Sequence, residues 1–209
     1  MRTLDRSLTP SAPVARQPRS VRIRAIRPTD ATELERFYTE LSPDSRRTRF
    51  FTVAPRLSHV QAVSFCTTDH DHREGFVAVL DRDQSVAERI VGHLCLEPYE
   101  DPAGGDIAGA AEVAIAVADQ FQHRGIGRRL LAAGTEWARR ERIGRLTATM
   151  LEGNAPIHRL LGGLAGRVRE RPIEAGLSEI TIDLVDRPPT AAPPQAALQR
   201  GRPATRARC

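Results

Sequence analysis

Apolar and basic residues alternate along residues 21–27, where Val21, Ile23 and Ala25 are separated by arginines. A period of two is typical of a β-strand with one buried face. Further short apolar segments, bounded by polar or turn-forming residues, predict strands at residues 75–80, 89–96, 112–118, 145–151, 167–173 and 178–185. The segment at residues 98–109 is rich in proline, glycine and aspartate and is predicted to be a loop.

Three helices are predicted between the first two strands. Asp30 and Glu33 have the spacing of a capping box and predict a helix with an apolar stripe at Leu34, Phe37, Tyr38 and Leu41. Ser42, followed by a proline, predicts the start of a short second helix. Ser58 with Gln61 forms another capping box and predicts a third helix that ends near residue 66.

Two further helices are predicted in the second half of the chain. Residues 125–142 present one apolar face, made of Ile126, Leu130, Leu131, Trp137 and Ala138. Residues 155–165 predict a shorter helix between two strands. This order of elements indicates an α/β fold, with a central mixed sheet of six to seven strands flanked by four to five helices.

At its N-terminal end the chain has prolines among serine, threonine and arginine, and at its C-terminal end it is rich in proline, alanine and arginine. Residues 1–20 and 187–209 lack periodicity and are predicted to be disordered, which leaves one folded domain at residues 21–186. The net charge of +5 arises in these tails, which carry +3 and +5, so the domain itself carries −3. A mildly acidic domain argues against nucleic acid as its partner.

All 31 basic residues are arginine, and the chain contains no lysine. This composition excludes a P-loop, a pyridoxal Schiff base and a protein-kinase site, since each requires a lysine. The chain has no apolar run long enough to span a bilayer, and its first residues lack the apolar core of a secretory signal. Cys66, Cys95 and Cys209 are not spaced for a disulfide framework or a zinc cluster. We therefore expect a cytoplasmic protein with no membrane partner.

The most distinctive segment begins at Glu112, where an apolar strand leads through a short polar turn into the long helix. Gly125 and Gly127 open that helix, so phosphate can approach unpaired backbone N–H groups and the positive end of the helix dipole. Arg124 and Arg128 add positive charge, and the pattern favours a pyrophosphate cradle for a ligand such as coenzyme A. A dinucleotide fingerprint would need a third glycine at residue 130, which is leucine. Glycines that serve only a tight turn remain the alternative.

Residues 122–127 (QHRGIG) resemble the Q/R-x-x-G-x-G/A motif of the GNAT superfamily of N-acetyltransferases. The resemblance extends over residues 21–185, and residues 152–157 (EGNAPI) stand where another motif of that family stands. Within the superfamily, residues 41–51 (LSPDSRRTRFF) and 111–117 (AEVAIAV) are most similar to the acetyltransferase domain of bacterial protein-lysine acetyltransferases. The resemblance implies the GNAT fold and transfer of an acetyl group from acetyl-CoA to a primary amine, either a protein lysine or a small molecule.

The same resemblance implies a set of cofactor-binding residues. The backbone of Ile115, Ala116 and Val117 is expected to pair with the pantetheine arm of acetyl-CoA. The pyrophosphate is expected to bind the amides of Gln122, His123, Arg124, Gly125, Ile126 and Gly127. Asn154 is expected to hydrogen-bond the cofactor, and no metal ion is implied.

Transfer to an amine needs a base, because a lysine-type amine is almost fully protonated at pH 7. Strand alternation places Glu112 on one face with Ala114 and Ala116, which leave room for a ligand, while the branched residues face a helix. A lone carboxylate at the start of an apolar strand is expected to have a raised pKa. Glu112 is therefore the candidate catalytic base, with Glu97 and Glu74 as alternatives. The alternative that Glu112 is only a solvated residue at the end of a strand, or is paired with an arginine, remains open.

Two features depart from the family pattern or suggest other chemistry. Many GNAT enzymes place a tyrosine acid seven residues after the motif asparagine, where this chain has Leu161, and the usual glycine-aromatic pair is replaced by Ala165-Gly166. A non-catalytic acyl-CoA-binding regulatory domain therefore stays open, as does a nucleic-acid binder acting through the arginine tails. The run at residues 69–72 (DHDH) lacks a further ligand nearby and is predicted to be a polar loop of the acceptor cleft.

Overall fold

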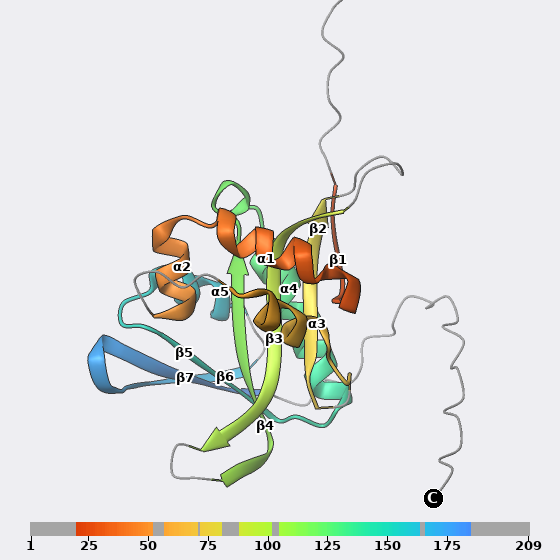
Figure 1. Cartoon of the computed structure of the whole chain (residues 1–209). Helices are drawn as coiled ribbons and strands as arrows, with labels where there is room; N and C mark the ends of the chain where they lie inside the picture. Colours follow the sequence, from red (N-terminus) through yellow and green to blue (C-terminus); the bar gives the residue numbers. More distant parts are fainter. Residues whose placement is uncertain are drawn as a thin grey trace, which may run out of the picture.

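The computed structural model describes residues 20–51, 57–70, 72–80, 88–101, 105–163 and 166–184. They form one mixed sheet with helices on both faces (Figure 1). The predicted C-terminal tail and, except for Ser20, the predicted N-terminal arm lie outside the described residues. The domain boundaries at residues 21 and 186 therefore stay predictions.

Seven strands form the sheet in the order β1-β2-β3-β4-β5-β7-β6. Their bounds are β1 (Val21–Ala25), β2 (Glu74–Leu80), β3 (Arg89–Asp101), β4 (Gly105–Val117), β5 (Arg145–Leu151), β6 (Gly166–Pro172) and β7 (Leu177–Leu184). All neighbouring strands are antiparallel except β4 and β5. The crossover that a parallel pair requires is made by the long helix α4 (Ile126–Arg140).

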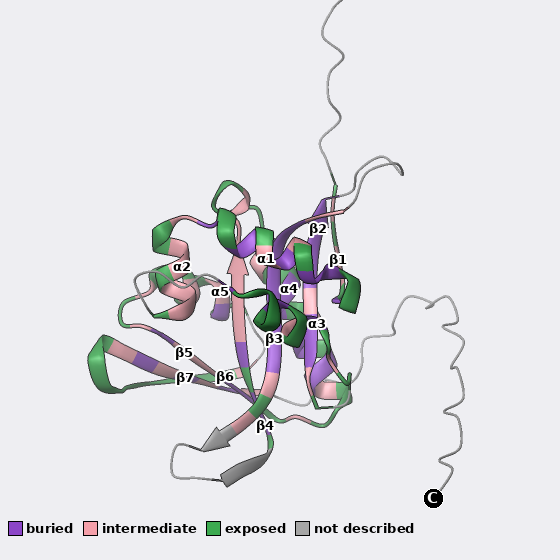
Figure 2. Cartoon of the chain, viewed as in Figure 1, coloured by how far each residue is buried: buried purple, intermediate pink, exposed green. Residues whose placement is uncertain are grey.

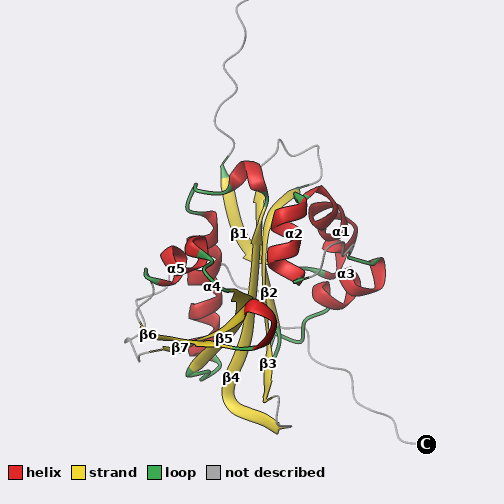
Figure 3. Ribbon diagram, turned by 90° about the vertical axis from the view of Figure 1, so that its left-hand side faces the viewer, coloured by secondary structure: helices red, strands yellow, loops and turns green. Residues whose placement is uncertain are grey.

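The other helices among the described residues are α1 (Ala31–Glu40), α2 (Pro43–Phe50), α3 (His59–Cys66) and α5 (Ala155–Leu161), with short 3₁₀ turns η1 (Pro28–Asp30), η2 (Asp119–Phe121) and η3 (Glu174–Gly176). Figure 3 shows α1, α2 and α3 on one side of the sheet and α4 and α5 on the other. The predicted fold class is thus confirmed. None of the described helices is long and apolar enough to cross a membrane.

Each face of the sheet has its own apolar core. On one face, α4 buries the side chains predicted for it: Ile126, Leu130, Leu131, Trp137 and Ala138. On the other face, α1 and α3 pack on β2 and β3 through Leu34, Phe37, Tyr38, Ala62 and Cys66. Cys66 and Cys95 are buried free thiols. Figure 2 shows β2 and β3 buried over much of their length, whereas the C-terminal half of β4 is only partly buried.

The prediction of a loop at residues 98–109 is wrong for most of that segment. β3 continues to Asp101 and β4 begins at Gly105, and the two strands stay paired beyond an irregularity near Pro98. Hydrogen bonding along a long hairpin outweighs the low strand propensity of proline, glycine and aspartate here. As a consequence, Glu112 lies well inside β4 rather than at its start.

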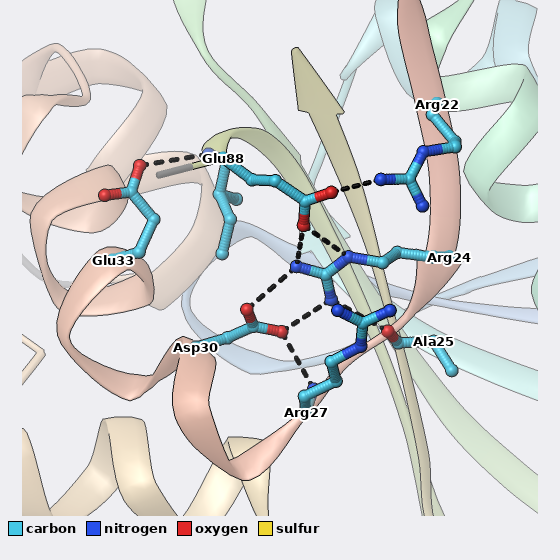
Figure 4. Close-up of polar contacts among 8 residues, drawn as sticks. Arg22, Arg24, Ala25, Arg27, Asp30, Glu33 and Glu88 are labelled. Carbon is cyan, nitrogen blue, oxygen red and sulfur yellow. Dashed lines mark hydrogen bonds and ion pairs between the residues drawn. The ribbon is translucent and has the colours of Figure 1, made fainter. Parts of the chain in front are cut away.

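Asp30 is the N-cap residue of α1, as predicted, but its side chain makes no capping hydrogen bond, so the predicted capping box with Glu33 is wrong. The Asp30 carboxylate accepts hydrogen bonds from both terminal nitrogens of Arg24, at 2.7 and 2.8 Å, and from the backbone N–H of Arg27 at 2.8 Å (Figure 4). Arg24 also donates to Glu88, which pairs with Arg22. The side chains of Arg24 and Asp30 are only 9% and 11% exposed, so the arginine holds the carboxylate more strongly than a helix amide would. These hydrogen bonds and ion pairs link β1 to η1 and to the start of β3.

We expect Asp30→Asn to lower the free energy of unfolding by about 1.5–3 kcal/mol at neutral pH, the usual worth of hydrogen bonds to a charged group. Burial raises the pKa of Asp30, but the hydrogen bonds from Arg24 and Arg27 lower it by more, so its folded pKa lies below the ordinary value. This stabilisation is therefore present above the unfolded pKa of ~3.9 and is lost as the pH falls through the folded pKa.

Urea unfolding near neutral pH and at about pH 3 measures this dependence. The matched control is Glu136→Gln, which changes an exposed acid on α4. A loss that is equal at both pH values would contradict the ion pair as its cause.

Candidate active site

Strands β4 and β5 part soon after they meet. They pair only at Ala110↔Arg145, Ala111↔Leu146 and Glu112↔Thr147. Residues 113–117 stay paired with β3, but in the described sheet they have no partner on the β5 side. Backbone groups on that edge can therefore hydrogen-bond to another extended chain.

A cavity of about 610 Å³ opens where the two strands part. Its size suits a small molecule or cofactor. Most of the predicted cofactor-binding residues line it: Ile115, Ala116, Val117, Gln122, His123, Gly125, Ile126, Gly127, Arg128 and Asn154. The fold thus brings together three separate stretches of sequence, the end of β4, the start of α4 and the start of α5.

The start of α4 has the geometry of an anion site. Gly125 is the N-cap residue, with φ 76° and ψ 4°, a left-handed conformation that favours glycine. Gly125 has no side chain to cap this helix, and among the described residues no acceptor is found for its first N–H groups, which lie with the positive end of the helix dipole at the cavity. His123 also has a positive φ of 58°, which helps to turn the chain sharply between β4 and α4. This arrangement suits a phosphate group.

A polar network that the sequence did not reveal fixes α2 against this turn. Gln122 Nε2 donates to the Val117 carbonyl oxygen at 3.1 Å and to Ser45 Oγ at 3.2 Å. The hydroxyls of Ser42 and Ser45 donate to the Asp119 carboxylate at 2.6 and 2.8 Å. Burial raises the pKa of Asp119, and these hydrogen bonds lower it by more, to below its usual range. The Gln122 side chain therefore supports the cavity wall.

The positive charge at the cavity differs from the predicted set. Arg128 lines the cavity, whereas Arg124 is not among its lining residues and instead places its guanidinium 5.5 Å from the ring centroid of Phe121. Arg49 of α2 and Arg159 of α5 line the cavity and were not predicted. Arg49 stands in a segment with several arginines, where spacing alone does not single one out.

Asn154 lies where β5 leads into α5 and lines the same cavity. Its side-chain oxygen accepts a hydrogen bond from the Ile157 N–H at 3.3 Å and so caps α5. This cap uses only the oxygen of the side chain. The amide nitrogen of Asn154, a donor, is not part of it.

The two faces of β4 carry the residues that strand alternation predicts. Val113, Ile115 and Val117 pack in the core beneath α4. Ala116 packs in the core on the α1–α3 side, the face that Glu112 shares. Glu112 is exposed and lies on β4 just beyond the residues that line the cavity.

The surroundings of Glu112 raise its pKa, as predicted. Loss of solvation is the largest cause, the charge of Arg49 opposes it, and the neighbouring Glu97 adds to it. Its pKa therefore lies above the ordinary glutamate value. A carboxylate with a raised pKa is better suited to accept a proton near neutral pH.

The two alternative carboxylates already have charged or polar partners. Glu97, which faces Glu112 across the β3–β4 pair, accepts hydrogen bonds from Arg73 at 2.5 and 2.8 Å. Glu74 is buried, accepts from the backbone N–H of Gly75 at 2.8 Å and contacts His70 Nδ1 at 3.0 Å. Among the described residues, Glu112 has no such ion pair, which distinguishes it from the other two.

The remaining predicted features lie away from the cavity or outside the described residues. Leu161 is buried in the core beneath α4, and its neighbour Leu160 lines the cavity, so this part of the α5 wall is apolar. In the run at 69–72, His70 contacts Glu74, and Asp71 is outside the described residues. No metal-binding cluster of His, Cys, Asp or Glu is found in the described part of the chain. Asp69, His70, His72, Pro98, Tyr99 and Gly109, which the structure describes, are not among the residues that line the cavity.

Comparison with known proteins agrees with this geometry. The sequence profile of the Acetyltransferase (GNAT) family matches residues 32–162. The GNAT domain of S. lividans PAT is 28% identical with a TM-score of 0.67, covering 78% of this chain and 90% of that one. A GCN5-related N-acetyltransferase from Kribbella flavida shares the fold, with 23% identity, a TM-score of 0.60, and coverage of 78% and 98%.

A third structure, yncA from Salmonella typhimurium, was solved with its cofactor acetyl-CoA. It is 18% identical, with a TM-score of 0.59, and the match covers 85% of this chain and 99% of that one. The family profile spans more than half of the 209 residues. The chain therefore belongs to the acetyltransferase (GNAT) family.

Proposed function

We propose that the protein transfers the acetyl group of acetyl-CoA to a primary amine, of a protein lysine or a small molecule, with Glu112 as the general base. One observation carries this proposal: β4 and β5 part at Glu112. Glu112, whose pKa is raised, therefore lies on β4 just beyond a cavity along which an open strand edge and a helix N-terminus follow in sequence. Acetyl-CoA offers a thioester, an amide-bearing arm and a pyrophosphate in the same order.

Residues of the cavity can hold each part of acetyl-CoA. The open edge of Ile115, Ala116 and Val117 can pair with the amides of the pantetheine arm as an added strand would. The N–H groups at the start of α4 suit the pyrophosphate, and Arg128 and Arg159 match its negative charge. The bound acetyl-CoA in the yncA structure supports this use of the fold.

Glu112 takes up the proton that the amine nitrogen loses as it is acylated, either directly or through water. An ordinary glutamate is a weak base at neutral pH. The pKa of Glu112 is raised and so lies closer to neutral pH, where a general base is most effective. Glu97 is less suitable as the base because it is paired with the positive charge of Arg73. Glu74 is less suitable because it is buried.

The departing thiolate needs no tyrosine in this proposal. Leu160 and Leu161 make the α5 wall apolar near the cavity, so that wall offers no proton donor at this point. A thiol with a pKa of ~8.5 is already a fair leaving group, and the thiolate can depart unprotonated.

The apolar α5 wall also supports a second candidate function, a regulatory domain that binds an acyl-CoA without efficient chemistry. An acceptor screen separates the two candidates. Small amines and proteins, the latter included because of the likeness to S. lividans PAT, are mixed with acetyl-CoA while free thiol is measured and products are identified by mass spectrometry. Thiol release with an equal amount of N-acetyl product supports the transferase. Tight acetyl-CoA binding without turnover on any acceptor would assign the regulatory role.

A further inference from the structure

Arg49 of α2 is a cation held among aromatic rings beside the cavity. Its guanidinium carbon lies 5.0 Å from the ring centroid of Phe50 and 6.0 Å from those of Tyr38 and Phe65. These rings fix its position from three sides and favour a positive charge over their faces. Arg49 is nevertheless partly exposed, and it lines the cavity.

The polar atoms of Arg49 are poorly matched within the protein. Nη2 donates to Cys95 Sγ at 3.6 Å, which is a weak acceptor, and Nε is buried with no hydrogen-bond partner. No carboxylate in the described part of the chain forms an ion pair with it. A partly buried charge without an opposite charge is costly, so a hydrogen-bond acceptor in the cavity would offset this cost by binding the guanidinium.

The register of the sheet shows which part of a ligand Arg49 would meet. Cys95, its contact, pairs with Ala114 across β3 and β4. Ala114 lies between Ala116, in the cavity wall, and Glu112 on the same face of β4. A cofactor that starts at the α4 N-terminus and runs back along residues 117 to 115 therefore places its acyl end near Ala114, which lies beside Cys95, the contact of Arg49, and two residues from Glu112.

We propose that Arg49 is a second catalytic residue, which donates a hydrogen bond to the thioester carbonyl oxygen of bound acetyl-CoA. The proposal rests on the proposed function. When the amine nitrogen bonds to the carbonyl carbon, a pair of electrons moves onto this oxygen, and the fixed positive charge of Arg49 stabilises it. The carbon–sulfur bond then breaks with its electrons going to sulfur, and the proton from nitrogen goes to Glu112. Arg49 itself keeps its protons throughout.

The test compares wild type with Arg49→Met, which has a long apolar side chain that can remain among the rings. Acetyl-CoA labelled with ¹³C at the carbonyl is added, and the carbonyl stretch of the bound thioester is read by difference infrared spectroscopy. In wild type, the band lies at lower frequency than in free acetyl-CoA, because a hydrogen bond weakens the C=O bond. In Arg49→Met, the band returns toward the free position while acetyl-CoA affinity stays within about twofold.

Turnover is the second readout. Arg49→Met lowers kcat by about 10²–10³-fold, as removal of one oxyanion donor does, with little change in acceptor KM. Arg47→Met, on the exposed side of the same helix, is the matched control and leaves both readouts unchanged. Arg49→Lys keeps a donor at the site and provides a second variant should the methionine variant fail to fold; it retains part of the band shift and of the rate.

Three other results would overturn either the role of Arg49 or the proposed function. A carbonyl band that is the same in wild type, Arg49→Met and Arg49→Lys overturns the proposal. So does a loss confined to the KM of acceptors that carry a carboxylate, which would make Arg49 an acceptor-binding residue. A band shift that depends on Arg49 in a protein without turnover on any acceptor would uphold the contact and refute the proposed function instead.

Discussion

Glu112→Gln is expected to lower kcat by about 10²–10⁴-fold, the usual contribution of a positioned general base. Glutamine is nearly isosteric with glutamate, and Glu112 lies outside the set of residues that line the cavity, so acetyl-CoA affinity should not change. The fold should be retained as well. Because folding raises the pKa of Glu112, its carboxylate costs stability above that pKa, and glutamine removes this cost.

The pH dependence of the rate identifies the base. Wild-type kcat/KM should fall at low pH with an apparent pKa above that of an ordinary glutamate, because Glu112 acts only when deprotonated. In Glu112→Gln this acidic limb should vanish, and the remaining rate should rise with pH as more of the acceptor amine becomes neutral.

Glu97→Gln is the matched control for this pH profile. It removes the neighbouring charge that raises the pKa of Glu112, so it should keep an acidic limb and move it to lower pH. Parallel profiles of equal height for wild type and Glu112→Gln would assign the proton to another group. A limb lost in Glu97→Gln alone would make Glu97 the base.

Gly125→Val is expected to weaken acetyl-CoA binding by more than tenfold, which corresponds to about 1.4 kcal/mol or more. Apart from residue 125 and its two chain neighbours, no described atom lies within 4 Å of where a β carbon would be, so the new side chain would occupy open space beside the cavity. Phosphate could then no longer approach the first N–H groups of α4. Calorimetric titration with acetyl-CoA measures the loss.

Gly176→Val separates this effect from backbone strain. Gly176 has φ 71°, close to the 76° of Gly125, and it too has open space where a β carbon would be. It belongs to η3, outside the set of cavity residues. Both variants should lose about 1–2 kcal/mol of stability from the left-handed backbone, while only Gly125→Val should lose binding. Equal affinities in two folded variants would remove the α4 N-terminus from the site.

Local patterns in the sequence were sufficient for much of this structure. The alternation along residues 112–118 predicted which side chains of β4 pack beneath α4, and the 3.6-residue period predicted the buried face of α4. Both follow from spacing within one element, which sequence displays directly. The capping box of Ser58 and Gln61 is equally local and was confirmed.

What the sequence did not reveal depends on contacts between distant segments. The side chain of Asp30 was assigned to a capping box because its partner Arg24 could not be identified from spacing. The contact of Ser42 with Asp119 joins residues 77 positions apart. Arg49 is one of 31 arginines, and its place among aromatic rings beside the cavity distinguishes it. The pairing of residues 98–101 with residues 105–111 likewise required knowledge of contacts between strands.

The most direct test of the central claim, that acetyl-CoA binds along β4 and at the start of α4, is amide hydrogen exchange with and without acetyl-CoA. Binding should slow exchange in peptides that cover residues 113–130, because the open edge of β4 and the first N–H groups of α4 would gain hydrogen-bond acceptors. Peptides of β6 and β7 should exchange at unchanged rates. Saturating acetyl-CoA that leaves residues 113–130 unprotected, or that protects only another part of the fold, would contradict the account.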